Sequence, residues 1–179
     1  PNTLRTKAIR LTNNATATLK SLPFKETDMD RSNAHLLRRG RFSEPGRLYL
    51  LTSVVENRHP VFSDFQIARL MVEQLQYAQH QRLAKSLAWV LMPDHLHWLI
   101  ELQHGTLASL MRRIKSRSTC LVNKTFHRKG RLWQHGFHDR ALRKDEDVQA
   151  VARYIVANPL RAGLVQNIGD YPHWDAIWL

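Results

Sequence analysis

Cysteine is almost absent from this sequence: Cys120 is the only one among 179 residues. A single thiol cannot form a disulfide within the chain, and a zinc site built from several cysteines is excluded. Cys120 falls within a segment of helical periodicity, so we interpret it as a buried structural thiol. A chain without disulfides is consistent with a reducing compartment, and we expect a cytoplasmic protein.

Long apolar runs are also absent. None approaches the roughly 20 consecutive apolar residues that a membrane-spanning helix needs. The first thirty residues contain no apolar stretch of the kind found in a secretory signal.

Acidic side chains are few relative to basic ones. Fifteen aspartates and glutamates stand against 27 lysines and arginines, which gives a formal net charge of +12 and an isoelectric point of about 10.6. An excess of this size predicts attraction to a polyanion. An anionic membrane surface is the alternative, but we expect a nucleic-acid partner and no membrane.

The length of the chain fits one domain with extensions, and 43% of its residues are hydrophobic, which is enough for one core. Residues 1–40 are basic and poorly patterned, and we interpret them as an N-terminal extension. Residues 41–170 hold the periodic segments and form the predicted domain. Residues 171–179 are an aromatic C-terminal tail that we expect to pack on it.

Hydrophobic periodicity divides the domain into strands and helices. Strands are predicted over residues 48–55, 87–92, 95–102 and 132–142, and helices over 65–83, 107–125 and 145–158. The order strand, helix, strand, strand, helix, strand is typical of the ferredoxin-like split βαβ arrangement. We therefore predict an α+β fold with a central antiparallel sheet, helices on one face and an additional C-terminal helix. Strand 95–102 is expected at the centre of the sheet.

Two histidines occur within that central strand, at His95 and His97. Because side chains alternate along a strand, both imidazoles project from one face, about 7 Å apart. Two buried imidazoles need a partner, and a single metal ion is one such partner. The alternative is a pair of histidines that are simply hydrogen-bonded or half exposed.

The C-terminal helix carries Tyr154 and Asn158, which are four residues apart and therefore share a helix face. A phenol oxygen can attack phosphorus, and an amide oxygen can ligate a hard cation. A free phenol has a pKa near 10, so it needs a nearby cation or base to become a nucleophile. The alternative is a core tyrosine followed by a helix-terminating Asn-Pro pair.

Basic residues cluster in two places, which we interpret as surfaces for DNA phosphates or, alternatively, as solvated charge. The first cluster ends the N-terminal extension, and the second occupies the polar face of helix 107–125. The residues are Arg38, Arg39 and Arg41, and then Arg112, Arg113, Lys115 and Arg117.

Three blocks of the sequence carry a family resemblance. Residues 92–97, Met-Pro-Asp-His-Leu-His, resemble the motif of the HUH single-tyrosine nucleases and transposases. Residues 132–140 and 154–165 resemble two further blocks of one branch, the REP-associated tyrosine transposases. The blocks stand in the expected order, and the resemblance runs from about residue 39 to residue 174.

The resemblance implies a ferredoxin-like catalytic domain that acts on single-stranded or hairpin DNA, specifically REP palindromes. By analogy, His95 and His97 hold Mg²⁺ or Mn²⁺, and Asn158 completes the protein ligands. Tyr154 attacks the scissile phosphate, which gives a 5′-phosphotyrosine link and a free 3′-hydroxyl. The resemblance thus implies an enzyme, a transposase or nuclease that cleaves and rejoins DNA in the bacterial cytoplasm, in association with the nucleoid.

Two residues of the second block, Gln134 and Asp139, match the family pattern as supporting positions around the site. The short link between residues 138 and 145 leaves little slack for exchanging the tyrosine helix between subunits. We therefore expect a monomer whose tyrosine acts in cis.

Two other functions compete with this interpretation. One is a non-catalytic hairpin-DNA-binding protein that retains the fold, and the other is a hydrolytic metalloenzyme that uses the histidine pair with activated water. The hydrolase lacks a downstream His-x-Asp-His continuation, and hydrolysis leaves no covalent protein–DNA link.

Overall fold

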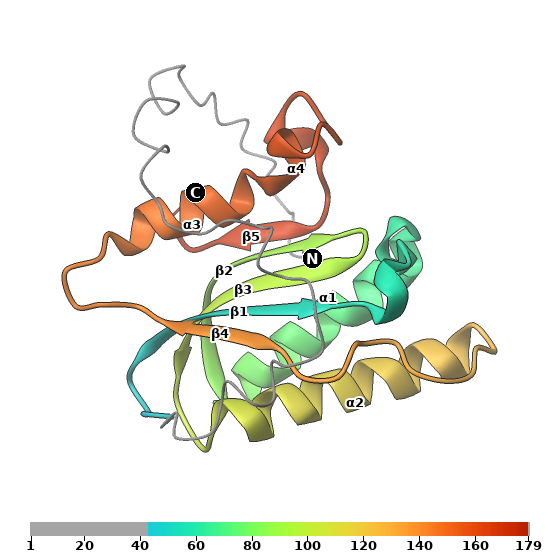
Figure 1. Cartoon of the computed structure of the whole chain (residues 1–179), viewed down its shortest axis with the longest axis horizontal. Helices are drawn as coiled ribbons and strands as arrows, with labels where there is room; N and C mark the ends of the chain where they lie inside the picture. Colours follow the sequence, from blue (N-terminus) through green and yellow to red (C-terminus); the bar gives the residue numbers. More distant parts are fainter. Residues whose placement is uncertain (1–42, 179) are drawn as a thin grey trace, which may run out of the picture.

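The structure is a computed structural model that describes residues 43–178. Its centre is an antiparallel sheet with the strand order β4-β1-β3-β2-β5 (Figure 1). The strands are β1 (Leu48–Val54), β2 (Ala84–Met92), β3 (His95–Leu102), β4 (His138–Ala141) and β5 (Trp174–Ala176). The helices are α1 (Phe65–His80), α2 (Leu107–Thr125), α3 (Val148–Val156) and α4 (Asn158–Arg161), and 3-10 turns cover Glu56–Arg58, Val61–Ser63 and Ile168–Asp170.

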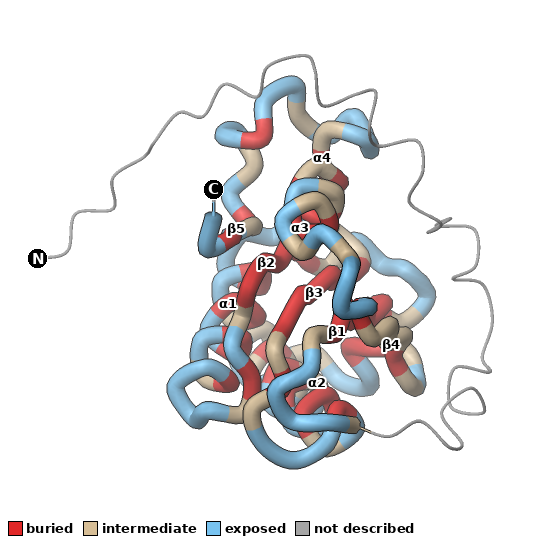
Figure 2. Tube along the Cα trace, turned by 90° about the vertical axis from the view of Figure 1, so that its left-hand side faces the viewer, coloured by how far each residue is buried: buried red, intermediate tan, exposed pale blue. Residues whose placement is uncertain are grey.

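The predicted α+β, ferredoxin-like architecture is confirmed, with β3 at the centre of the sheet. Helices α1 and α2 lie on one side of the sheet, and α3 lies on the other (Figures 1 and 2). Figure 2 shows that the buried residues concentrate along β1, β2 and β3, between these two layers. The predicted basic residues Arg38, Arg39 and Arg41 lie outside the described residues.

Alternation along β3 assigns its side chains to two separate cores. Leu96, Trp98 and Ile100 pack into the core beneath α1 and α2. Leu99 packs into the core beneath α3, together with Ile155 of that helix. Since His95 and His97 share the parity of Leu99, the two imidazoles face the side of the sheet that carries α3.

Local capping fixes where the helices start. The side chain of Asp64 accepts hydrogen bonds from the backbone N–H groups of Gln66 and Ile67, which starts α1 at Phe65. Asp147 caps α3 in the same way through the N–H of Ala150. Carboxylates at these positions satisfy donors that have no partner inside the helix.

The C-terminal helix is shorter than predicted. The expected single helix over 145–158 starts three residues later, at Val148, and ends at Val156; Asn158 instead begins the separate short helix α4. Pro159 lies in the first turn of α4, where its missing N–H removes no helical hydrogen bond. Tyr154 and Asn158 are therefore on consecutive helices.

The predicted strand 132–142 is also shorter, because regular pairing is confined to β4. We call residues 130–137 the wall segment; it runs beside α2 (Figure 1) and forms only a single bridge, between Trp133 and Val55. Gly130 and Gly136 adopt φ values of 89° and 78°, which glycine accommodates without strain. These turns interrupt the extended run at both ends.

Side chains of α2 hold the wall segment in place. Lys115 Nζ donates to the carbonyl oxygen of Gln134 at 2.6 Å and also to that of Gly136. Trp133 Nε1 donates to Ser118 Oγ at 2.9 Å in a buried hydrogen bond. The segment therefore has a defined position although it lies outside the regular sheet.

Aromatic residues near the C-terminus are built into the sheet. Strand β5 pairs with β2, and the Tyr171 hydroxyl donates to the carbonyl oxygen of Leu91 at 2.7 Å. None of the helices in residues 43–178 is both long and apolar enough to cross a membrane.

We predict that Ser118→Ala lowers the free energy of unfolding by about 1–2 kcal/mol, because it leaves the buried Trp133 N–H without its acceptor. Urea denaturation measures this loss. The exposed Ser116 on the same helix is the matched control, and Ser116→Ala should change stability by less than about 0.5 kcal/mol. Equal losses in the two variants would contradict the role given to the Trp133–Ser118 hydrogen bond.

Candidate active site

His95 and His97 lie at the start of β3, directly after the turn at Pro93 and Asp94. Both are buried, with relative exposures of 7% and 2%. Their ring centroids are 4.8 Å apart and the ring planes meet at 84°. The sequence prediction that the two imidazoles share one face and lie close together is therefore confirmed in geometry.

Asp94 orients the first imidazole. His95 Nδ1 lies 2.5 Å from Asp94 Oδ1, and Arg58 Nη1 donates to Asp94 Oδ2 at 2.9 Å. Burial raises the pKa of Asp94, but its hydrogen bonds with His95 and Arg58, together with their charges, outweigh burial and lower the pKa overall. An ionised carboxylate only accepts hydrogen bonds, so His95 Nδ1 carries the proton.

The other ring nitrogen of His95, Nε2, is buried and has no hydrogen-bond partner among residues 43–178. A buried polar atom of this kind is uncommon in proteins and points to a ligand.

Thr52, on β1, orients the second imidazole. Its hydroxyl lies 2.9 Å from His97 Nδ1, within the register in which Thr52 is opposite His97. Burial lowers the pKa of His97 to about 3, with further lowering by the charges of His95 and Arg161. His97 is therefore neutral near pH 7, which is the state in which an imidazole ligates metals.

The donor set fits a metal ion in the partners of its second ring nitrogens. Metal-binding histidines usually engage the second ring nitrogen with a carboxylate or another oxygen, as Asp94 and Thr52 do here. Within residues 43–178, no group of three or more His, Cys, Asp or Glu side chains could hold a metal. A bound ion would therefore need oxygen ligands from an amide, a phosphate or water.

Asn158 supplies such an amide. It is buried, with 3% exposure, and its Oδ1 accepts a hydrogen bond from Arg161 Nη1 at 3.0 Å. The same guanidinium lies over the ring of Tyr154, with its central carbon 4.3 Å from the ring centroid. Arg161 therefore contacts both residues that the sequence analysis selected on the C-terminal helices.

Arg161 also links these residues to the histidines, because its charge contributes to the lowered pKa of His97. The sequence analysis overlooked Arg161. Its position three residues after Asn158 was the available signal, since side chains spaced i and i+3 meet on a helix surface. Arg161 thus contacts Tyr154 and Asn158 and acts electrostatically on His97, within a single chain and on the α3 side of the sheet.

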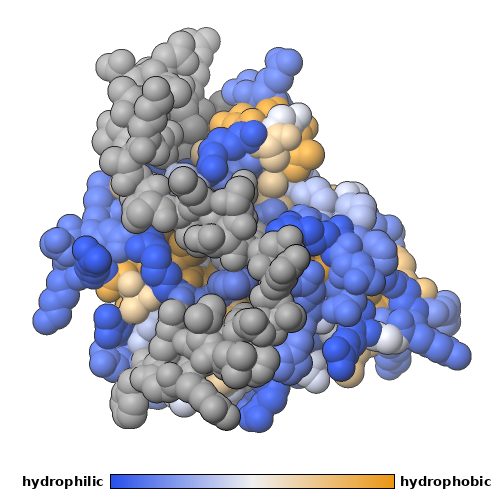
Figure 3. All heavy atoms as spheres, viewed as in Figure 1, coloured by the Kyte–Doolittle hydropathy of each residue, from blue (hydrophilic) through white to orange (hydrophobic). Residues whose placement is uncertain are grey.

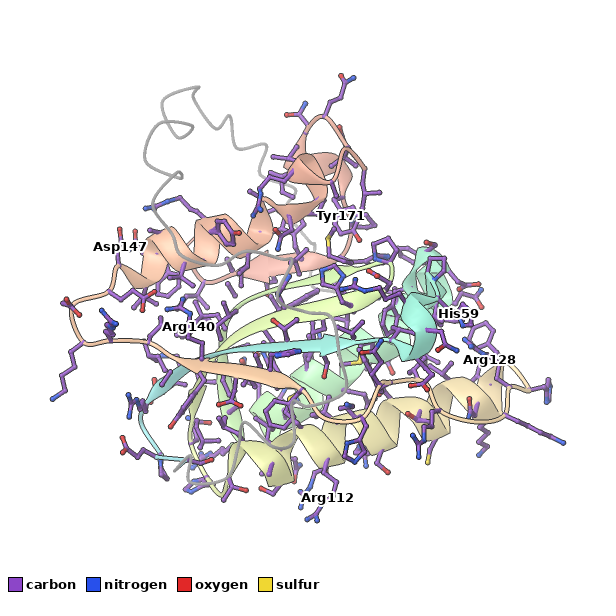
Figure 4. All side chains as sticks on the ribbon, viewed as in Figure 1. His59, Arg112, Arg128, Arg140, Asp147 and Tyr171 are labelled. Atoms are coloured by element: carbon purple, nitrogen blue, oxygen red, sulfur yellow. The ribbon has the colours of Figure 1, made fainter. Side chains whose placement is uncertain are left out.

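The predicted basic residues of α2 lie on the opposite side of the sheet. Arg112 and Arg113 are exposed, and Figure 4 shows Arg112 projecting from α2 into solvent. Lys115 bonds to the wall segment, and Arg117 donates to Gln74 Oε1 at 3.1 Å. In the view of Figure 3, hydrophilic residues cover most of the described surface, while apolar residues gather near α4.

Gln134 and Asp139, the two residues predicted to support the site, lie on different segments, the wall segment and β4. The backbone N–H of Gln134 donates to the carbonyl oxygen of Val54 at 2.9 Å, which ties the wall segment to the end of β1. Asp139 is opposite Leu51 in the β1–β4 register, and Leu51 belongs to the core beneath α1 and α2. Alternation therefore directs Asp139 away from the face that carries His97.

Comparison with known proteins gives consistent results. A family model of IS200-like transposases matches residues 47–158. A REP-associated tyrosine transposase from Escherichia coli K12 is 32% identical over 89 residues, which cover 48% of this chain and 50% of that protein. A second relative, from Haemophilus influenzae, is 25% identical over 139 residues, covering 72% of this chain and 78% of that protein.

A solved structure of a REP-associated tyrosine transposase bound to a REP hairpin is similar in fold, with a TM-score of 0.63. It is 25% identical in sequence, and the match covers 75% of this chain and 79% of that one. The family model spans more than half of the chain and includes His95, His97, Tyr154 and Asn158. The chain therefore belongs to the IS200-like transposase family and is similar to the REP-associated tyrosine transposases within it.

Proposed function

We propose that this protein cleaves and rejoins single-stranded DNA beside a hairpin, through a covalent bond between Tyr154 and the DNA. The observation that carries the proposal is the position of Arg161, which contacts Tyr154 and Asn158 and acts electrostatically on His97. Because these residues belong to one chain, we also propose that a monomer acts in cis.

The substrate proposed is a REP-type hairpin with an unpaired flank. Support comes from the similar protein that has been solved in complex with a REP hairpin. The net charge of +12 agrees with a polyanionic substrate and predicts salt-sensitive binding.

In the proposed reaction, the Tyr154 oxygen attacks the scissile phosphorus and loses its proton. The bond between phosphorus and the 3′ oxygen breaks, and the released 3′ oxygen takes up a proton. The products are a 5′-phosphotyrosine and a free 3′-hydroxyl, which can attack in reverse to rejoin the strand. One phosphodiester replaces another, so no external energy source is needed.

Arg161 would favour this attack by holding a positive charge beside Tyr154, because its guanidinium lies over the Tyr154 ring. Its planar fork has five N–H donors, of which the contact with Asn158 uses one, so others remain for a phosphate oxygen.

His95, His97 and Asn158 are the residues proposed to hold Mg²⁺ or Mn²⁺, and the buried His95 Nε2, which has no hydrogen-bond partner among residues 43–178, is the observation that supports this. When bound, such an ion polarises the phosphodiester and neutralises developing negative charge. Thr52 and Asp94 keep the two rings oriented. Asn158 Oδ1 must exchange its hydrogen bond with Arg161 to serve as a ligand.

We predict that the protein, incubated with a tailed REP hairpin and Mg²⁺ or Mn²⁺, forms a covalent DNA adduct that resists denaturing electrophoresis. Tyr154→Phe should abolish the adduct and change hairpin affinity by less than about threefold, because only the attacking oxygen is removed. EDTA should also prevent the adduct.

Tyr77→Phe is the matched control, since Tyr77 lies beneath Arg117 on the other side of the sheet. This variant should form the adduct normally. An undiminished adduct in Tyr154→Phe would overturn the assignment of Tyr154 as the nucleophile. Hairpin binding by the wild type without any adduct would favour the non-catalytic hairpin-binding alternative.

Arg161→Gln should slow adduct formation by about 100-fold, the usual cost of removing one charged donor from a reacting centre. Arg161→Lys should recover part of the rate. A second measurement is independent of activity: the His97 pKa, followed by NMR, should rise in Arg161→Gln because a lowering charge is lost.

The exposed Arg153 on α3 provides the control, and Arg153→Gln should leave the rate and the His97 pKa unchanged. A normal rate in Arg161→Gln would show that the guanidinium has no part in the reaction.

In metal-free protein, acid should weaken folding through His97. Its pKa in the folded chain, about 3, is below the ordinary value of 6.5, so the unfolded chain takes up the proton first. Stability from this group is complete above about pH 6.5 and falls by about 1.4 kcal/mol per pH unit as the pH drops toward 3. Urea denaturation of wild type and His97→Gln at several pH values measures the difference, and parallel curves would contradict it.

A further inference from the structure

A groove of about 620 Å³ lies between α2 and the wall segment. Its interior is mainly apolar and includes Met111, Leu132 and Phe137. Charged and polar side chains line it as well, among them Arg112 and Arg131, both exposed. A volume of this size is typical of sites for small molecules or a few nucleotides.

The groove is built rather than incidental. Its outer wall is bonded to α2 at three places, by Lys115 to two carbonyl oxygens, by Trp133 to Ser118, and by Asn123 Nδ2 to the carbonyl oxygen of Gly130 at 2.9 Å. These bonds span the length of the wall segment. The groove therefore keeps its shape without a ligand, and binding there would cost little ordering of the protein.

Backbone hydrogen bonds connect this wall to the histidine site. The backbone N–H of Gln134 donates to the carbonyl oxygen of Val54 at 2.9 Å. Val55, which follows Val54, donates from its N–H to the carbonyl oxygen of Asp94 at 2.8 Å. Val54 is opposite His95 in the β1–β3 register. The wall and His95 are thus two strand positions apart, or about 10 Å. The groove and the histidine site therefore adjoin at the end of β1, on opposite sides of the sheet.

The chemistry of the groove suits unpaired nucleotides. Proteins that bind single strands combine a positive groove, which follows the phosphates, with an apolar surface for the bases. Residues 1–42 are the other candidate occupant, since Ser43 accepts a hydrogen bond at the start of α2. That segment has nine lysines and arginines against three acidic residues. Its net charge is therefore positive, like that of the groove, and electrostatic repulsion opposes its binding there.

We propose that this groove binds the unpaired nucleotides of the DNA strand beside the hairpin and guides that strand to the active site. The inference rests on the proposed function. The groove lies across the sheet edge from Tyr154, so it contributes to binding and positioning and supplies no reacting group.

The first experiment measures affinity for a hairpin with a single-stranded tail and for the same hairpin without one. The double variant Arg112→Gln/Arg131→Gln should bind the tailed hairpin about tenfold more weakly and the untailed hairpin within about twofold of wild type. Its dependence on salt for the tailed hairpin should also decrease, because fewer phosphate contacts remain.

The matched control removes two charges from the same part of the chain outside the groove. Lys124 and Lys129 are exposed and do not line it. Lys124→Gln/Lys129→Gln should bind both DNAs within about threefold of wild type.

The second experiment uses the protein's own probe. Cys120 is the only cysteine of the chain and lines the groove. The sequence interpretation of a buried thiol was wrong, because Cys120 is exposed on α2. Reaction of its thiol with a chromogenic disulfide should slow at least about fivefold when the tailed hairpin is bound and stay unchanged with the untailed one.

The outcomes separate this inference from the proposed function. Two results together would overturn the role given to the groove and leave the proposed function intact. They are tight binding of the tailed hairpin without protection of Cys120, and equal affinities of the two double variants. A thiol that reacts slowly in the free protein, and no slower with DNA, indicates that residues 1–42 occupy the groove and also overturns the inference. Failure to bind any hairpin overturns both.

Discussion

The structure depends on the burial of β3 on both of its faces. A strand in this position must be apolar throughout, unless its polar side chains are satisfied within the protein or by a ligand. His95 and His97 break the apolar pattern on one face only, while Leu96 and Trp98 maintain it on the other. The alternation of one strand thus separates a purely structural side from a chemically active one.

Burial has a direct electrostatic consequence for the active side. The lowered pKa of His97 means that its ring stays neutral, and the ionised Asp94 beneath His95 fixes which ring nitrogen carries the proton. Arg161, itself exposed, adds a positive charge beside Tyr154 and Asn158. Two imidazoles, one cation and one phenol are a combination suited to an anionic substrate.

The sequence was sufficient to predict the fold and the sheet face, because both depend on periodicity. Strand alternation placed His95 and His97 together, and the order of elements placed β3 at the centre. The sequence was insufficient where side chains from distant segments meet. The bond between Lys115 and the wall segment joins residues about twenty positions apart, and no local pattern reveals it.

The helix that carries Tyr154 shows a second limit of local patterns. Four-residue spacing predicted a shared helix face for Tyr154 and Asn158, and both contact Arg161, but the boundary at Ala157 depends on Pro159 and moves Asn158 into α4. Arg161 was overlooked for a related reason. Among the 27 lysines and arginines of the chain, its spacing of three from Asn158 was a signal too weak to single it out.

The two edge strands of the sheet have a consequence for the behaviour of the molecule in solution. Both are very short, since β4 has four residues and β5 has three, while the three strands between them have seven to nine. Edge strands this short present few unpaired backbone groups of their own, and edge-to-edge growth of the sheet between molecules is disfavoured. A protein rich in buried β structure is in this way protected from aggregation by its smallest elements.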